Sequence, residues 1–88
     1  MQIIYSPQFV KDYKKMAEQT KRKAESKENI FRNNPFDNRL KTHKLSGKFH
    51  DLWSFSVDYN CRIIFKFKSE KAIIFHAIGG YSIYGREI

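Results

Sequence analysis

Two neighbouring segments in the second half of the chain alternate between apolar and polar residues, and this pattern constrains the fold more than any other feature. Residues 53–59 read WSFSVDY and residues 62–68 read RIIFKFK, with a turn expected at residues 58–60. A period of two is typical of strands that bury one face. Residues 72–78, AIIFHAI, follow another expected turn and are apolar on both faces, which favours a central place in the sheet. We therefore predict an antiparallel meander of three strands.

The first half of the chain has a helical pattern after a short β-prone run at residues 3–5. Ser6-Pro7 suits a helix start, because serine can cap free amides and proline at the first helical position loses no needed donor. Apolar residues then recur every three or four positions as far as Ala24, with lysines between them. The pattern predicts an amphipathic helical region with a basic outer face.

This helical region fits either one long helix or two. The break, if there is one, is expected at residues 18–20, where Thr20 would cap a second helix. That second helix would make its last core contacts through Ile30 and Phe31. It would end at residues 33–35, NNP, because the residue before a proline is pushed out of the α region.

Together these elements predict an α+β fold of two layers that forms a single domain over residues 1–88. An N-terminal strand comes first, then a helix or helical hairpin, then the meander. The larger apolar residues of the first two meander strands are expected to face the helices. The opposite sheet face would then carry Ser54, Ser56, Arg62, Ile64, Lys66 and Lys68. Three cations and two hydroxyls on rigid strands make that face suitable for holding a phosphate.

The chain is basic and contains one cysteine. Its 88 residues carry a formal net charge of +8, which favours nucleic acid, an anionic membrane surface or an acidic protein as partner, although a merely solvated surface is the simpler explanation. No stretch approaches the roughly 20 apolar residues of a membrane span, and the N-terminus lacks the features of a secretory signal. The lone Cys61 excludes an internal disulfide and fits a reducing compartment. We expect a cytoplasmic protein.

Motifs for metals and cofactors are missing from the sequence. Three scattered histidines and one cysteine show no zinc-site spacing, and neither GxGxxG nor GxxxxGK(S/T) occurs. The basic helix needs its apolar face for the core, which argues against membrane binding. We expect no metal, no small-molecule cofactor and no membrane partner.

Four stretches carry a family resemblance: NPFDNRLKTHKLSG at 34–47, LWSFSV at 52–57, CRIIFKF at 61–67 and IGGYSIY at 78–84. In this order they resemble the RelE/ParE superfamily of toxins from bacterial type II toxin–antitoxin systems. The resemblance covers essentially the whole chain. It implies a helical hairpin packed on an antiparallel sheet, and a cognate antitoxin that wraps the toxin. The charge of +8 leads us to expect an acidic antitoxin.

The resemblance leaves three functions open. The RelE-like branch implies a ribosome-dependent, metal-free endoribonuclease that cleaves mRNA and inhibits translation, with the ribosome and mRNA as partners. The ParE branch implies a poison of DNA gyrase that lacks the nuclease residues, and an inactive relative would only bind antitoxin or nucleic acid. Because the fold is shared, the function has to be inferred from the site. The cations of the polar sheet face make the nuclease our leading hypothesis.

Metal-free RNA cleavage needs three kinds of group. One takes a proton from the attacking 2′-hydroxyl, one stabilises charge on the phosphate, and one protonates the leaving 5′-oxygen. Arg62 stands where related toxins carry a phosphate-holding arginine, and its planar fork suits two-pronged contact with a phosphate. The alternative is a surface arginine paired with Asp58 or Glu70.

Three more residues are candidates for proton transfer or base stacking. His43 stands just before LSG, where nuclease relatives often carry a His or Lys with such a role. Tyr84 matches an aromatic residue of related toxins, whereas Tyr81 stands where a catalytic His is usual. A phenol, with an ordinary pKa of about 10, is a poorer proton shuttle at neutral pH than an imidazole. Arg62, His43, Tyr84 and Tyr81 are therefore the predicted catalytic residues.

Other basic residues are expected to bind nucleic acid, and one of them, His50, is also a weaker candidate for proton transfer. They are Lys44, Lys48, His50, Lys66 and Lys68. His76 lies inside the apolar third strand of the meander and is expected to be buried or at an interface.

Overall fold

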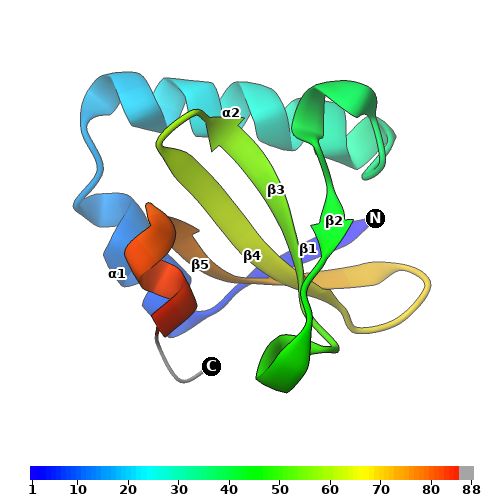
Figure 1. Cartoon of the computed structure of the whole chain (residues 1–88). Helices are drawn as coiled ribbons and strands as arrows, with labels where there is room; N and C mark the ends of the chain where they lie inside the picture. Colours follow the sequence, from blue (N-terminus) through cyan, green and yellow to red (C-terminus); the bar gives the residue numbers. More distant parts are fainter. Residues whose placement is uncertain (86–88) are drawn as a thin grey trace.

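Five strands and two helices form the fold in the computed structural model, which describes residues 1–85 (Figure 1). In chain order they are β1 (Gln2–Tyr5), α1 (Pro7–Lys14), α2 (Glu18–Asn33), β2 (His43–Lys44), β3 (Trp53–Asp58), β4 (Cys61–Phe67) and β5 (Ala72–Gly79). Three short 3₁₀ turns join or follow them: η1 (Asn38–Leu40), η2 (Gly47–Phe49) and η3 (Tyr81–Gly85). The predicted α+β class and the predicted meander, β3 to β5, are confirmed.

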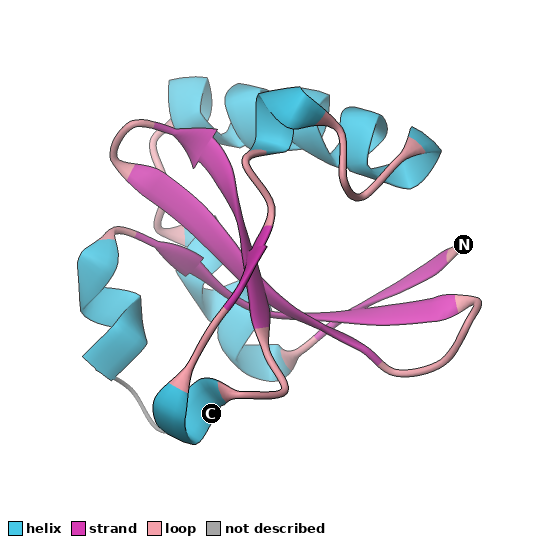
Figure 2. Ribbon diagram, turned by 45° about the vertical axis from the view of Figure 1, so that its right-hand side comes forward, coloured by secondary structure: helices cyan, strands magenta, loops and turns pink. Residues whose placement is uncertain are grey.

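The strands form one sheet in the order β1-β5-β4-β3-β2. β1 pairs with β5 in parallel, and the other neighbours pair antiparallel. Figure 2 shows the strands fanning out as the sheet twists. The third meander strand, β5, is an inner strand with a neighbour on each side, as predicted, and β4 occupies the middle of the five. The N-terminal strand extends the sheet beyond β5, and the two-residue β2, which the sequence did not predict, extends it beyond β3.

α1 begins at Ser6-Pro7, as predicted. The Ser6 hydroxyl accepts a hydrogen bond from the Phe9 amide at 3.0 Å, and Pro7 occupies the first turn of the helix. The same hydroxyl donates to the carbonyl of His76 on β5 at 2.9 Å. This serine therefore caps the helix and also ties it to the sheet.

The helical region consists of two helices, but the break was predicted three residues too late. α2 begins at Glu18 with Ala17 as its N-cap, so that Thr20 lies inside the helix and does not cap it. The chain turns just before this point, where Met16 packs against the core. Glu18 also places a negative charge at the positive end of the α2 dipole, which favours a start at this residue.

Both helices cover one face of the sheet, with α1 against β5 and α2 against β3. Phe31 of α2 is fully buried, and its ring lies 4.9 Å from the rings of both Phe55 and Phe65. Ile30 packs against the same core and α2 ends at Asn33, so both predictions for the end of this helix are confirmed. Burial of one such ring contributes about 1.5–3 kcal/mol, which holds the helices on this face.

The opposite face of the sheet is not the open polar surface that the alternation suggested. Ile64 and Ala77 are fully buried there, in a small second core with Leu52 and Ile83. The turn η3 can lie this close to the sheet because β5 ends in Gly79, where a Cβ would come within 2.8 Å of Ile83 Cγ2. The second core thus covers the middle of this face.

Candidate functional site

Arg62 is the second residue of β4 and lies on the sheet face opposite the helices. Its cross-strand neighbours are Ser56 on β3 and Gly79 on β5. One terminal nitrogen, Nη1, donates to Ser56 Oγ at 3.2 Å, and the other, Nη2, donates to the Tyr81 hydroxyl at 2.9 Å. The guanidinium carbon also lies 5.0 Å from the centroid of the Tyr81 ring. The side chain is therefore held in place from two sides.

Both groups that accept hydrogen bonds from Arg62 are uncharged hydroxyls. Within residues 1–85, no carboxylate forms a hydrogen bond or ion pair with this guanidinium, and Asp58, one expected partner, contacts Lys23 at 3.5 Å instead. The hydrogen bond to Tyr81 raises the pKa of Arg62 above its ordinary value. The positive charge is thus fixed in position but not neutralised, which suits it to an anionic ligand.

Tyr81 and Tyr84 both come from η3, which folds back over the second core. Their ring centroids are 6.0 Å apart. Tyr81 is 68% exposed, whereas Tyr84 is half-buried and its hydroxyl lies 2.8 Å from Ser54 Oγ on β3. The predicted site residues Arg62, Tyr81 and Tyr84 are therefore brought together, and hydrogen bonds to two serines of β3 link them to the sheet.

His43 lies on the edge strand β2, where its cross-strand partner is Ser54. Partners in an antiparallel pair project to the same face, so His43 faces the same side as Ser54. Its Nδ1 lies 3.1 Å from the carbonyl oxygen of Lys41, which can only accept, so Nδ1 carries the proton in this contact. In the neutral ring Nε2 is then left as a proton acceptor. The exposed His43 is thus suited to act as a base.

The predicted nucleic-acid-binding residues do not form one cluster with Arg62. Lys44 pairs with Trp53 and so projects to the helical side of the sheet. Lys48 and His50 are exposed in and just after η2.

The two later lysines lie further along β4, beyond the second core. Lys66 shares the face of Arg62 but forms an ion pair with Asp51 at 3.2 Å. Lys68 follows the end of the strand, and six residues of β structure place it roughly 20 Å from Arg62.

His76, which was expected to be buried or at an interface, is half-buried on β5. Its Nε2 is buried and forms no hydrogen bond within the described residues. Burial, and next the nearby Lys66 charge, lower the pKa of this imidazole, so it stays neutral at neutral pH. Residues 1–85 contain no group of three His, Cys, Asp or Glu side chains placed to hold a metal ion, and no helix among them is long and apolar enough to cross a membrane.

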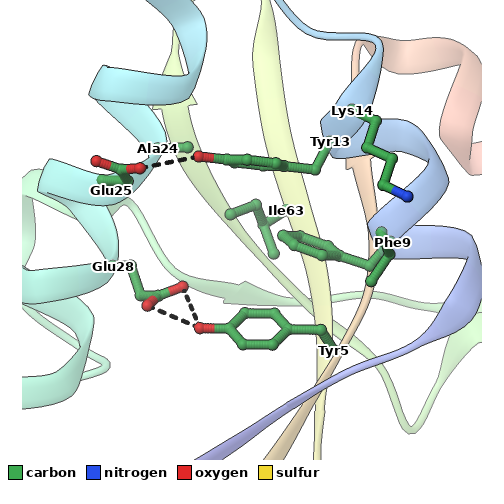
Figure 3. A pocket seen from close by; sticks show the side chains of 9 residues that line it. Tyr5, Phe9, Tyr13, Lys14, Ala24, Glu25, Glu28 and Ile63 are labelled. Atoms are coloured by element: carbon green, nitrogen blue, oxygen red, sulfur yellow. Dashed lines mark hydrogen bonds between the residues drawn. The ribbon is translucent and has the colours of Figure 1, made fainter.

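A cavity of about 370 Å³ opens on the helical side of the sheet, between α1 and α2 (Figure 3). Phe9 and Ile63 line it, and the hydroxyls of two tyrosines at its edge already donate to glutamates: Tyr5 to Glu28 at 2.9 Å and Tyr13 to Glu25 at 3.1 Å. Burial and these carboxylates raise the pKa of both tyrosines, which stay neutral. The cavity is an apolar recess on the face opposite Arg62.

Sequence reasoning did not single out Ser54 and Ser56 as site residues. Both were assigned to the polar sheet face, but only the register of β3 against β4 pairs Ser56 with Arg62, and only η3 brings Tyr84 to Ser54. The alternation of apolar and polar residues in β3 was the only sequence signal that placed these two serines on the same face as Arg62.

Comparison with protein-family profiles assigns the chain to a family. The sequence profile described as the bacterial toxin YafQ of type II toxin–antitoxin systems matches residues 1–84. No curated protein sequence matches significantly. Among solved structures, YafQ from E. coli strain BL21(DE3) is similar at a TM-score of 0.78 and 26% identity, over 93% of this chain and 94% of that one.

Two other solved structures extend the comparison. YafQ in the E. coli DinJ–YafQ toxin–antitoxin complex is similar at a TM-score of 0.74 and 25% identity, over 92% of both chains. A YoeB/ParE toxin from Agrobacterium tumefaciens, at 15% identity, shares the fold with a TM-score of 0.78 over 92% of this chain and 99% of that one.

Proposed function

Because the chain belongs to the YafQ family of toxins from bacterial type II toxin–antitoxin systems, we propose that it is a metal-free endoribonuclease that cleaves messenger RNA on the ribosome. The observation that carries this proposal is the geometry of Arg62. Its guanidinium is fixed by Ser56 and Tyr81, both neutral, and has no carboxylate partner in the described part of the chain. A positioned, uncompensated cation is what the charge that develops on a phosphate requires.

The neighbouring residues supply the proton transfers that this reaction needs. His43 Nε2 takes the proton from the 2′-hydroxyl, whose oxygen then forms a bond to the adjacent phosphorus. Arg62 stabilises the charge on the phosphate oxygens, and the P–O5′ bond breaks as a tyrosine of η3 gives a proton to the leaving 5′-oxygen. The products are a 2′,3′-cyclic phosphate and a 5′-hydroxyl.

Binding of the RNA outside the reacting phosphate is the role proposed for the other cations. Lys48 and His50 are exposed beside the second core and need no rearrangement to reach a phosphate. Lys66 would first have to leave Asp51. Electrostatic contacts of this kind position the strand and carry little sequence information.

An antitoxin is the proposed protein partner. The solved relative from E. coli is described in complex with the antitoxin DinJ, and the net charge of +8 favours an acidic binding segment. The apolar recess between α1 and α2 supports such binding, because it can receive an apolar side chain of the partner.

The test is cleavage of a defined message on purified, programmed ribosomes, with the new ends analysed chemically. We expect cuts in the ribosome-bound message that leave a 2′,3′-cyclic phosphate and a 5′-hydroxyl. A parallel assay of DNA gyrase supercoiling addresses the alternative function. If the messages stay intact and gyrase is inhibited, the protein is a gyrase poison and not a nuclease. If neither assay shows an effect, the protein is an inactive relative.

A further inference from the structure

Ser54 is a polar residue at a buried position beside the second core. Its side chain is fully buried, and the next residues across the sheet in the same row are the buried Ile64 and Ala77 of the second core. Burying a hydroxyl costs free energy unless it is hydrogen-bonded. The buried Ser54 hydroxyl therefore needs a hydrogen-bond partner.

That partner is Tyr84, whose hydroxyl lies 2.8 Å from Ser54 Oγ. The Ser54 side chain makes no other hydrogen bond within the described residues. The buried Ser54 proton is consequently satisfied only if Ser54 donates and Tyr84 accepts. Tyr84 is half-buried, so its own proton can point outward, away from Ser54.

The bond also fixes the direction of the Tyr84 side chain. Ile83 fastens η3 to the second core through apolar contacts, which have no preferred direction. The hydrogen bond from rigid β3 supplies that direction and keeps the Tyr84 ring 6.0 Å from the Tyr81 ring, which in turn contacts Arg62.

We propose that Ser54 is a positioning residue for RNA cleavage: its buried hydroxyl donates to the phenol oxygen of Tyr84 and so leaves the Tyr84 proton free to be given to the leaving 5′-oxygen. This inference rests on the proposed function and deepens it. It assigns the role of acid to Tyr84 and makes that role depend on a residue that never touches the RNA.

The experiment is single-turnover cleavage on programmed ribosomes with S54A, Y84F and the double variant. Misplacement of a reacting group can cost about 100-fold in rate, and we expect S54A to slow cleavage by about 10- to 100-fold at saturating ribosome with little change in the half-saturating concentration. Since Ser54 acts through the Tyr84 hydroxyl, the double variant should be no slower than Y84F alone.

Two further variants separate the hydrogen bond from packing. S54C keeps the volume of the side chain but is a weak donor, so it should be as slow as S54A. S82A removes an exposed hydroxyl from η3 and should cleave at the parent rate. Thermal melts identify any variant that fails to fold. If S54A does not fold, Y84F still removes the same hydrogen bond, because it changes the less buried of the two partners.

Three outcomes would overturn the inference. The first is that S54A or S54C cleaves as fast as the parent. The second is that S54A slows Y84F by the same factor as it slows the parent, since this would give Ser54 a purely structural role. The third is that the parent does not cleave at all, in which case the proposed function fails as well; the first two leave that function standing.

Discussion

Arg62 and Tyr81 act as one unit at the scale of single residues. The Tyr81 hydroxyl accepts a hydrogen bond from Arg62 Nη2, and the ring lies beside the guanidinium. Tyr81, at the position where the family resemblance led us to expect a histidine, therefore holds the arginine that we propose binds the phosphate. We interpret Tyr81 as a residue that orients Arg62, with proton transfer left to His43 and Tyr84.

Substitution of Tyr81 tests this interpretation. Y81F removes the oxygen that Arg62 binds, and because a hydrogen bond to a charged group is worth about 1.5–3 kcal/mol, cleavage should fall about tenfold or more. Y81H restores a ring nitrogen that can accept from Arg62 or transfer a proton near neutral pH, so it should cleave at least as fast as the parent. The measurement is the single-turnover rate at pH 7, and a Y81H variant as slow as Y81F would contradict the interpretation.

Among the secondary-structure elements, the sequence predicts the strands β3 and β4 of the site well, but it does not predict the turn η3 or the edge strand β2. The alternation in β3 and β4 is local, so the faces of Ser56 and Arg62 could be assigned before the structure was known. The turn η3 and the edge strand β2 are too short to have a periodicity, and both are held by distant contacts, such as Ile83 in the second core and His43 beside Ser54. The hydrogen bonds that assemble the site therefore could not be predicted.

The helices illustrate the same limit. The start of α1 was predicted because Ser6-Pro7 is a local signal, whereas the break between the helices was misplaced because Thr20 is a good cap by its chemistry alone. Packing decided otherwise: Met16 reaches the core from the turn that precedes α2. Local capping preferences of about 1 kcal/mol are easily overridden by such burial.

In the molecule as a whole, the sheet separates two surfaces for which we propose different roles. One carries Arg62, Tyr81 and the proposed RNA contacts, and the other carries the helices with the apolar recess between them. The helical side is also basic, since Lys11, Lys14 and Lys15 are exposed on and just after α1. This division suits an antitoxin that binds the helical side and an RNA that binds the other.

Binding of the antitoxin should therefore combine charge and apolar contact. The product of the neighbouring gene should co-purify with this chain, and the complex should survive moderate salt while its association rate falls as salt screens the charges. A variant with K11E and K15E should associate more slowly and dissociate at nearly the parent rate. Surface plasmon resonance over a salt series measures both rates, and absence of any complex at low salt would contradict the toxin–antitoxin partnership proposed here.

We propose that Arg62 stabilises the charge on the phosphate during RNA cleavage, and the cleavage rate of R62A on programmed ribosomes tests this. Loss of a charge-stabilising group typically costs about 10²–10³-fold in rate, and R62K should recover little of it, because lysine lacks the two-pronged fork. R22A removes an exposed arginine from α2 on the other face of the sheet and serves as the matched control. We predict that R62A melts like the parent and cleaves at least 100-fold more slowly, with R22A unchanged; a well-folded R62A that cleaves at the parent rate would contradict the claim.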